Sequence, residues 1–260
     1  MSSGGIGRRG FLVRAGCYVS VGLLAMAARP DEVPASAAAS VFDDFNGPPG
    51  SPPDPAVWAY RVGRGWDDGI ESYRPENAVL DGVGNLVIRA AATGNGYVSG
   101  RVQTKHGFGY GTTRARIKMP SGQGLWPAFW MIGADDDKAE IDIIELVSSA
   151  TTYYSTIHGP RTGGGPGYQV QFTGGVADLS DDYHEYWMTH EPQRITAGID
   201  SATLATFVPE SLPPEGIWVY ERPMCAVLSM AVGGDWAGPP DASTRFPATM
   251  FVDWIRWESL

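Results

Sequence analysis

Three acidic residues lie close together in one strongly apolar segment, which reads Glu-Ile-Asp-Ile-Ile-Glu. Successive side chains of a strand point to opposite faces, so Glu140 and Asp142 share one face and the intervening isoleucines pack on the other. Strict alternation would turn Glu145 toward the core. A bulge of one residue near Ile143 or Ile144 would return Glu145 to the face of the other two acids. The segment therefore predicts a bulged strand that presents three carboxyl groups in a row.

Such a row of carboxyl groups suits the retaining hydrolysis of a glycosidic bond. That reaction uses two carboxyl groups about 5 to 5.5 Å apart, one as the nucleophile and one as the proton donor. The outer backbone positions of the row lie about 13 Å apart, so the long side chains of Glu140 and Glu145 would lean inward over a concave strand. The central Asp142 can orient the nucleophile by a hydrogen bond. Crowding of negative charge favours keeping the third acid protonated.

Two other interpretations of the same acids stay open. A solvated acidic strand edge would carry three carboxylates, although it would not need isoleucine at the intervening positions. Three acids on one strand could also hold calcium, although oxygen cages normally draw their ligands from loops.

The elements that must position these acids are short strands. No window of a dozen residues in the chain after residue 40 has apolar residues at helical spacing, and no repeat is visible. Strands are predicted at residues 85–89, 113–119, 140–147, 154–157, 194–199, 226–232 and 250–257, with loops at 47–53, 163–167 and 238–240. Around a dozen such strands without crossover helices predict one all-β domain over residues 40–260, an antiparallel sandwich.

The composition excludes several classes of protein. The 260 residues include 34 Gly and 20 Pro and only 18% are charged, which favours a turn-rich folded protein over a disordered chain or a coiled coil. The 19 basic and 29 acidic residues leave a net charge of −10, the wrong sign for binding a phosphate backbone or an anionic membrane surface. Nucleic acid and membrane are therefore not expected partners.

Residues 1–39 have the order of an export signal and its cleavage region. Arg8-Arg9 precede an apolar stretch from Cys17 to Ala28, and small residues follow from Ala35 onward. The paired arginines resemble a twin-arginine signal, although Gly7 stands where that pattern usually has Ser or Thr. We expect a secreted or extracytoplasmic protein that is exported by this route. An uncleaved anchor is the alternative, although the apolar stretch is shorter than the roughly 20 residues of a bilayer span.

Removal of the signal would leave Cys225 as the only cysteine, so no internal disulfide is expected. Cys225 lies in the apolar run Met-Cys-Ala-Val-Leu, which predicts a small buried core residue; a reactive nucleophile is the alternative.

Together with its neighbouring segments, the acidic strand resembles the active-site region of glycoside hydrolase family 16, and most closely its laminarinase-like branch. The matching stretches are residues 41–47, 99–101 with 104–105, 122–130, 156–160, 231–234 and 250–254. The resemblance implies a β-jelly-roll sandwich with a concave substrate cleft and endo-hydrolysis of β-1,3-glucans, with no cofactor needed for the chemistry. We expect a monomer whose partner is a polysaccharide.

The resemblance also implies roles for single residues. Glu140 would be the nucleophile, Asp142 its assistant and Glu145 the general acid/base. The implied substrate-binding residues are Trp126, Trp130, Arg101, His158 and Trp66. Indole faces can stack on a pyranose ring, but core packing is the alternative for the first two tryptophans. Without the family motif around them, Arg101 and His158 would be interpreted as structural residues.

A structural calcium ion on the convex side is a further implication of the resemblance. Its ligands would be the side chains of Asp44 and Asp253 together with the carbonyl of Gly84.

The chain departs from the pattern of the laminarinase-like branch at several places. A Trp-Pro pair and a Gly usually precede the first catalytic Glu, where this chain has Asp-Asp-Asp-Lys-Ala at 135–139. A Gly-Trp-Gly-Asn-Asn-Glu segment is replaced at residues 65–70, an Asn by Ser229 and a Trp by His190. All but the last of these changes bear on the cleft, so the preferred glucan and its linkage stay open.

Two further functions use the same residues. A non-catalytic, lectin-like protein could bind a β-glucan on the same sandwich without cleaving it. A transglycosylase would pass the covalent intermediate to a second sugar in place of water.

Overall fold

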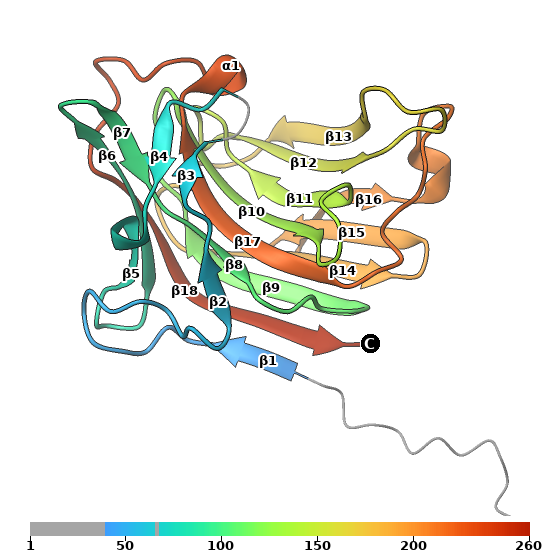
Figure 1. Ribbon diagram of the computed structural model, residues 1–260, viewed down its shortest axis with the longest axis horizontal. Helices are drawn as coiled ribbons and strands as arrows, with labels where there is room; N and C mark the ends of the chain where they lie inside the picture. Colours follow the sequence, from blue (N-terminus) through green and yellow to red (C-terminus); the bar gives the residue numbers. More distant parts are fainter. Residues whose placement is uncertain (1–39, 66–67) are drawn as a thin grey trace, which may run out of the picture. The chain divides into compact units, whose positions relative to one another are not determined.

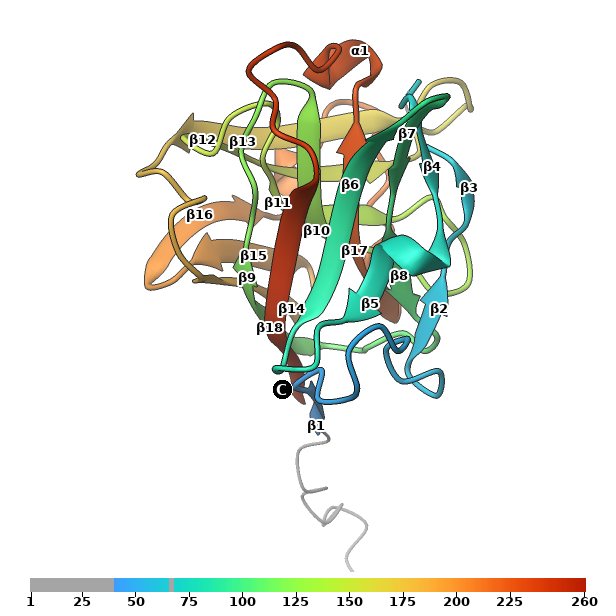
Figure 2. The same cartoon turned by 90° about the vertical axis from the view of Figure 1, so that its left-hand side faces the viewer.

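The computed structural model describes residues 40–65 and 68–260 of the chain. The predicted export signal at residues 1–39 and the predicted substrate residue Trp66 lie outside these described residues. Two β-sheets pack face to face (Figures 1 and 2) and carry nearly all of the regular structure. The helical elements are short: α1 (Gly234–Ala237) and two 3₁₀ turns, η1 (Pro75–Asn77) and η2 (Pro209–Ser211).

The larger sheet has eleven strands in the order β16-β15-β14-β9-β18-β6-β7-β4-β3, with β1 added to β18 and β5 to β6. Its strands are β1 (Ser40–Asp43), β3 (Gly63–Arg64), β4 (Glu71–Tyr73), β5 (Ala78–Leu80), β6 (Leu86–Thr93), β7 (Gly96–Ser99), β9 (Gly111–Lys118), β14 (His184–Glu191), β15 (Arg194–Ile199), β16 (Ala202–Phe207) and β18 (Ala248–Ser259). One pair, β4 with β7, is parallel, and the other described pairs are antiparallel as predicted.

The smaller sheet has seven antiparallel strands in the order β13-β12-β11-β10-β17-β8-β2. Its strands are β2 (Trp58–Tyr60), β8 (Arg101–Thr104), β10 (Leu125–Gly133), β11 (Glu140–Glu145), β12 (Thr152–Gly159), β13 (Tyr168–Gly175) and β17 (Met224–Val232). Strands β10 and β17 curve along their length (Figure 1), and β11 with its three acids lies beside β10. The fold is the predicted all-β sandwich.

The core fills the space between the sheets. Strand β9 shows how the sequence builds it, because Ala115 and Ile117 are buried while Arg114 and Arg116 alternate with them on the outer face. Strand β10 differs, since it is buried on both faces. Its outer face forms a second apolar cluster of Ala128, Trp130 and Ile132 with Cys225 and Val227 of β17. The prediction of a buried structural Cys225 is confirmed.

No helix within residues 40–65 and 68–260 has the length and apolar character needed to span a bilayer.

Candidate active site

The bulge predicted in the acidic strand is present. Along β11, Asp142 pairs with Trp130 of β10 and Ile144 pairs with Phe129, so Ile143 is the extra residue between two consecutive partners. The pairing of β11 with β12 shifts in the same interval, between Asp142 and Glu145. Both isoleucines of the bulge are fully buried. Hydrophobic burial of two adjacent side chains therefore holds the kink that returns Glu145 to the outer face.

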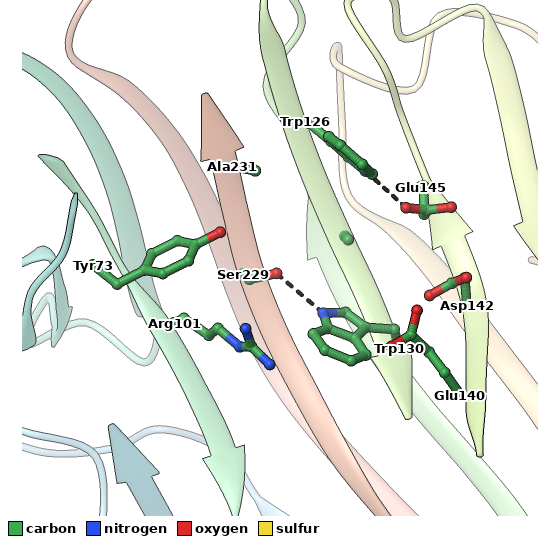
Figure 3. A pocket seen from close by; sticks show the side chains of 10 residues that line it. Tyr73, Arg101, Trp126, Trp130, Glu140, Asp142, Glu145, Ser229 and Ala231 are labelled. Atoms are coloured by element: carbon green, nitrogen blue, oxygen red, sulfur yellow. Dashed lines mark hydrogen bonds between the residues drawn. The ribbon is translucent and has the colours of Figure 1, made fainter. Parts of the chain in front are cut away.

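The three acids line one cleft on the outer face of the seven-stranded sheet (Figure 3). Asp142 lies between the other two along the strand. The cleft has a free volume of about 610 Å³ on the side of Trp236. A second cavity of about 580 Å³ adjoins it through Arg101, which lines the region near the acids as well. The acids thus lie in the middle of an open groove.

Glu145 is held in a fixed orientation and is 6% exposed. The indole N–H of Trp126 donates a 2.7 Å hydrogen bond to Glu145 Oε1. Burial raises the pKa of Glu145 well above its usual value, and the neighbouring Asp142 and Glu140 raise it further. The bond from Trp126 and the nearby His158 act in the opposite direction. The balance favours a protonated carboxyl group, as a proton donor requires.

Asp142 and Glu140 both face His158 on the neighbouring strand. His158 lies directly opposite Glu140 in the pairing of β11 with β12. Its Nε2 is 3.2 Å from Asp142 Oδ2 and 3.9 Å from Glu140 Oε1. Asp142 is 4% exposed, and its backbone carbonyl accepts a hydrogen bond from the Ser155 hydroxyl. His158, which the resemblance implied as a substrate-binding residue, is thus in direct contact with the acid cluster.

Trp130 combines the two roles that the sequence left open. It is 8% exposed and belongs to the outer apolar cluster, yet it also lines the cleft near the acids. Its indole N–H donates to the Ser229 hydroxyl at 3.1 Å, and the guanidinium of Arg101 lies 4.7 Å from the ring centroid. Ser229, which the sequence marked only as a departure, therefore fixes the ring that forms this part of the cleft wall.

Trp126 is half-buried and contacts an aromatic group that the sequence analysis missed. Trp236 of α1 lies edge-on to Trp126 at 4.9 Å and to Tyr154 at 4.8 Å between ring centroids. Trp236 is 42% exposed, and it lines the cleft together with Gln171 of β13. Its place between a pair of glycines and a third glycine, in Gly-Gly-Asp-Trp-Ala-Gly, was the available signal for an exposed aromatic in a tight turn.

Glu71 is a buried acid behind the cleft wall that the sequence did not reveal. Its carboxyl group is 1% exposed and accepts a 2.9 Å hydrogen bond from the backbone N–H of Val232, at the end of β17. Burial raises its pKa, while Tyr73 and Arg101, which both line the cleft, act to lower it. Glu71 therefore links the strand that leads to α1 with two residues of the cleft wall.

The described departures from the family pattern lie along the cleft, with one exception, as expected. Asp68 lines the cleft beside the acids, and residues 135–137 line the cavity on the Arg101 side. Arg222 pairs with Asp135 and Asp136 at 3.1 and 3.2 Å. His190 is different: it is buried against Tyr110 and lines none of the described cleft cavities.

The residues predicted to hold calcium are only partly arranged for an ion. A side chain added at Gly84 would come within 4.0 Å of the backbone oxygen of Asp44, so these two positions are neighbours. The carboxylate of Asp253 is engaged elsewhere, in a 2.5 Å ion pair with Arg116. Calcium binding through Asp253 would have to break that pair, and the site stays a prediction.

Comparison with known proteins identifies the family. The model of glycosyl hydrolases family 16 matches residues 71–256, which include every described residue of the cleft discussed above except Asp68. The chain belongs to glycoside hydrolase family 16. A β-glucanase of Rhodothermus marinus is 32% identical over 228 residues, covering 78% of this chain and 79% of that protein.

Solved structures of the family share the fold. The catalytic domain of an endo-1,3-β-glucanase (laminarinase) from Thermotoga petrophila is 31% identical, with a TM-score of 0.74, and the match covers 85% of this chain and 98% of that one. One similar protein is named for its activity on a polysaccharide other than glucan. A keratan-sulfate endo-1,4-β-galactosidase of Sphingobacterium multivorum is 29% identical over 82% of this chain, which spans 53% of that relative's length. This family 16 chain is thus a glycoside hydrolase of the β-glucanase-like type.

Proposed function

We propose that this protein is an exported, retaining endo-β-glucanase that cleaves β-1,3-linked, laminarin-like glucan. The observation that carries the proposal is the convergence of Glu140, Asp142 and Glu145 on one open cleft, with the pKa of Glu145 raised by burial. Cavities on both sides of the acids suit a glucan chain that crosses the site, as endo-cleavage requires. The β-glucanase and laminarinase relatives support the choice of substrate.

The proposed reaction has two displacements. Glu140 attacks the anomeric carbon, and the bond to the glycosidic oxygen breaks as Glu145 gives that oxygen its proton. One oxygen of Glu145 accepts the Trp126 N–H, which leaves the other to carry the proton. Water then loses a proton to Glu145 and attacks the same carbon, which releases Glu140. Asp142, between the two, orients Glu140 and strengthens the retention of the proton on Glu145.

A digest of a polysaccharide panel tests this proposal most broadly. The purified protein would be incubated with laminarin, mixed-linkage glucan, cellulose and a galactan, and the products sized by mass spectrometry. The Glu140→Gln variant from the same preparation controls for contaminating enzymes. Short oligosaccharides from laminarin are the expected result. Tight binding of a glucan in calorimetry without any cleavage would replace hydrolysis by the lectin-like function. Products longer than the substrate would indicate transglycosylation instead.

We also propose export through the twin-arginine route, a monomeric state, and calcium as a structural ion. The export proposal rests on the order of residues 1–39.

The calcium proposal can be tested by thermal unfolding. Calcium should raise the melting temperature of protein first treated with a chelator, because an ion bound only by the native state stabilises it. An unchanged melting temperature would remove the calcium site.

A further inference from the structure

One nitrogen and two carboxylates meet in the cleft in a way that hydrolysis alone does not require. Glu140, Asp142 and His158 each offer a ligand atom, and the three atoms lie within 4.8 Å of one another. The shortest separation, 3.2 Å between His158 Nε2 and Asp142 Oδ2, is close to the roughly 3.4 Å between two ligands of a tetrahedral zinc ion with bonds of about 2.1 Å. Glu140 Oε1, at 3.9 Å from the same nitrogen, would have to move closer to His158 to complete a tetrahedral site.

The three ligands are carried by rigid elements. Glu140 and Asp142 lie on β11, and His158 lies on the adjacent β12, directly opposite Glu140. The paired strands fix both backbones, and the Glu140 side chain is half-buried. All three residues line the same open cleft, so water could reach an ion held between them. Three protein ligands and one open position is the arrangement that zinc adopts in sites accessible to solvent.

The donor types favour a transition metal over calcium or magnesium. Calcium and magnesium take oxygen ligands in larger numbers, whereas imidazole nitrogen together with carboxylate oxygen suits zinc or copper. The neighbouring carboxylates of Glu140 and Asp142 add an electrostatic attraction for any cation that enters the cleft.

We propose that Glu140, Asp142 and His158 form a zinc site, and that zinc bound there inhibits the enzyme reversibly. The inhibition rests on the proposed function, whereas the metal site itself does not. An ion held by Glu140 would occupy the oxygen lone pairs that must attack the anomeric carbon. It would also lie where the sugar binds, so zinc competes with the substrate and a chelator restores the activity.

Calorimetric titration of zinc chloride into the full chain, without a histidine tag and in a non-coordinating buffer, measures the site without any need for activity. We expect one equivalent of zinc to bind to the wild type. His158→Gln should weaken zinc binding by more than about tenfold. Mutating residues that only hydrogen-bond to a metal ligand already lowers metal affinity by about 10- to 100-fold. Glu140→Gln tests the second ligand in the same way and guards against a folding defect in one variant.

The matched control is His184→Gln. His184 Nδ1 also lies close to a carboxylate, at 2.8 Å from Asp200 Oδ2. His184 belongs to β14 of the other sheet, and among the described residues this pair is not part of a group of three possible metal ligands. Its loss should leave zinc affinity and activity unchanged. Inhibition kinetics with the active substrate should show competition between zinc and glucan.

Zinc affinity that survives His158→Gln and Glu140→Gln, or that disappears in His184→Gln, would overturn the proposal. So would bound zinc that leaves hydrolysis unaffected or inhibits without competing with substrate. If no glucan is cleaved but zinc binds through His158, the proposed hydrolysis fails while the metal site stands, so the two failures are distinguishable.

Discussion

The outer faces of the two sheets carry their acidic side chains in opposite arrangements. On the eleven-stranded sheet two acids each meet a guanidinium of β9: Glu185 accepts from Arg114 at 2.6 Å, and Asp253 accepts from Arg116 at 2.5 Å. On the seven-stranded sheet three acids crowd together on β11. There, the pKa of Glu145 is raised by burial and by its two acidic neighbours.

The difference shows what each face is arranged for. Opposite charges side by side are compatible with a stable, solvated surface. Buried like charges cost stability, and they persist where a protonated acid beside an ionised one has a chemical use. The crowded acids of the cleft therefore lower the stability of the fold, whereas the paired charges of the opposite face do not. Substitutions at single residues can test this contrast.

The largest effect should come from removing the acids of the cleft. Glu140→Gln and Glu145→Gln should each lower kcat by at least about 10³-fold, because one removes the nucleophile and the other the proton donor. Initial rates on the preferred glucan measure this, with circular dichroism to check the fold. Glu185→Gln, on the opposite face, is the matched control and should keep the wild-type rate. Near wild-type cleavage by either cleft variant would contradict the mechanism.

Trp126→Phe should act on the proton donor through a single bond. The indole N–H lowers the pKa of Glu145, so its loss should raise that pKa further. Because the reaction needs Glu145 protonated, the alkaline limb of the kcat/KM profile should move to higher pH, with a loss of rate of roughly tenfold at most from weaker positioning. A limb that moves to lower pH, or does not move, would separate Trp126 from the ionisation of Glu145.

The crowding of the cleft should be visible in stability as well. Glu145 has a raised folded pKa, so the stability it contributes is present below the unfolded pKa of about 4.3 and is lost as pH rises through the folded value. Glu145→Gln carries no such charge and keeps an acceptor for Trp126. The variant should therefore be more stable than wild type near pH 8, by about 1 kcal/mol, with the gain fading toward pH 4. Chemical denaturation at several pH values measures it, and a variant less stable at pH 8 would be the contrary result.

The smallest effect should come from the paired charges. A double-mutant cycle of Arg114→Ala and Glu185→Ala should give a coupling of only about 0.2–1 kcal/mol, because both side chains are about one-third exposed. A coupling of several kcal/mol would mean that this pair, and not the cleft, is the energetically special region.

The sequence predicted the acidic strand well because its information is local. Alternation and the isoleucine at the extra position were enough to place the bulge, and the seven segments predicted as strands all lie in strands, apart from residues at their ends. Strand β10 carries no such alternation: it is apolar on both faces and contains Pro127, which argues against a central strand. Periodicity therefore did not predict this strand, and only the family resemblance placed its Trp126 and Trp130 in the cleft.

The partners of the acids depended on long-range contacts that no spacing encodes. Glu71 lies 161 positions from Val232, and Ser229 lies 99 positions from Trp130, yet both pairs are hydrogen bonded. Each of these polar residues looks ordinary in its own segment. Only the pairing of β17 with β10, and the contact of β4 with the end of β17, gives them a place in the cleft.

The stereochemistry of the first product tests the central claim most directly. Attack by Glu140 inverts the anomeric carbon and attack by water inverts it again, so proton NMR in the first minutes of digestion should show the β-anomer of the new reducing end. The α-anomer appearing first would mean that no covalent intermediate forms on Glu140, and it would contradict the assignment of a nucleophile and a proton donor to this row of acids.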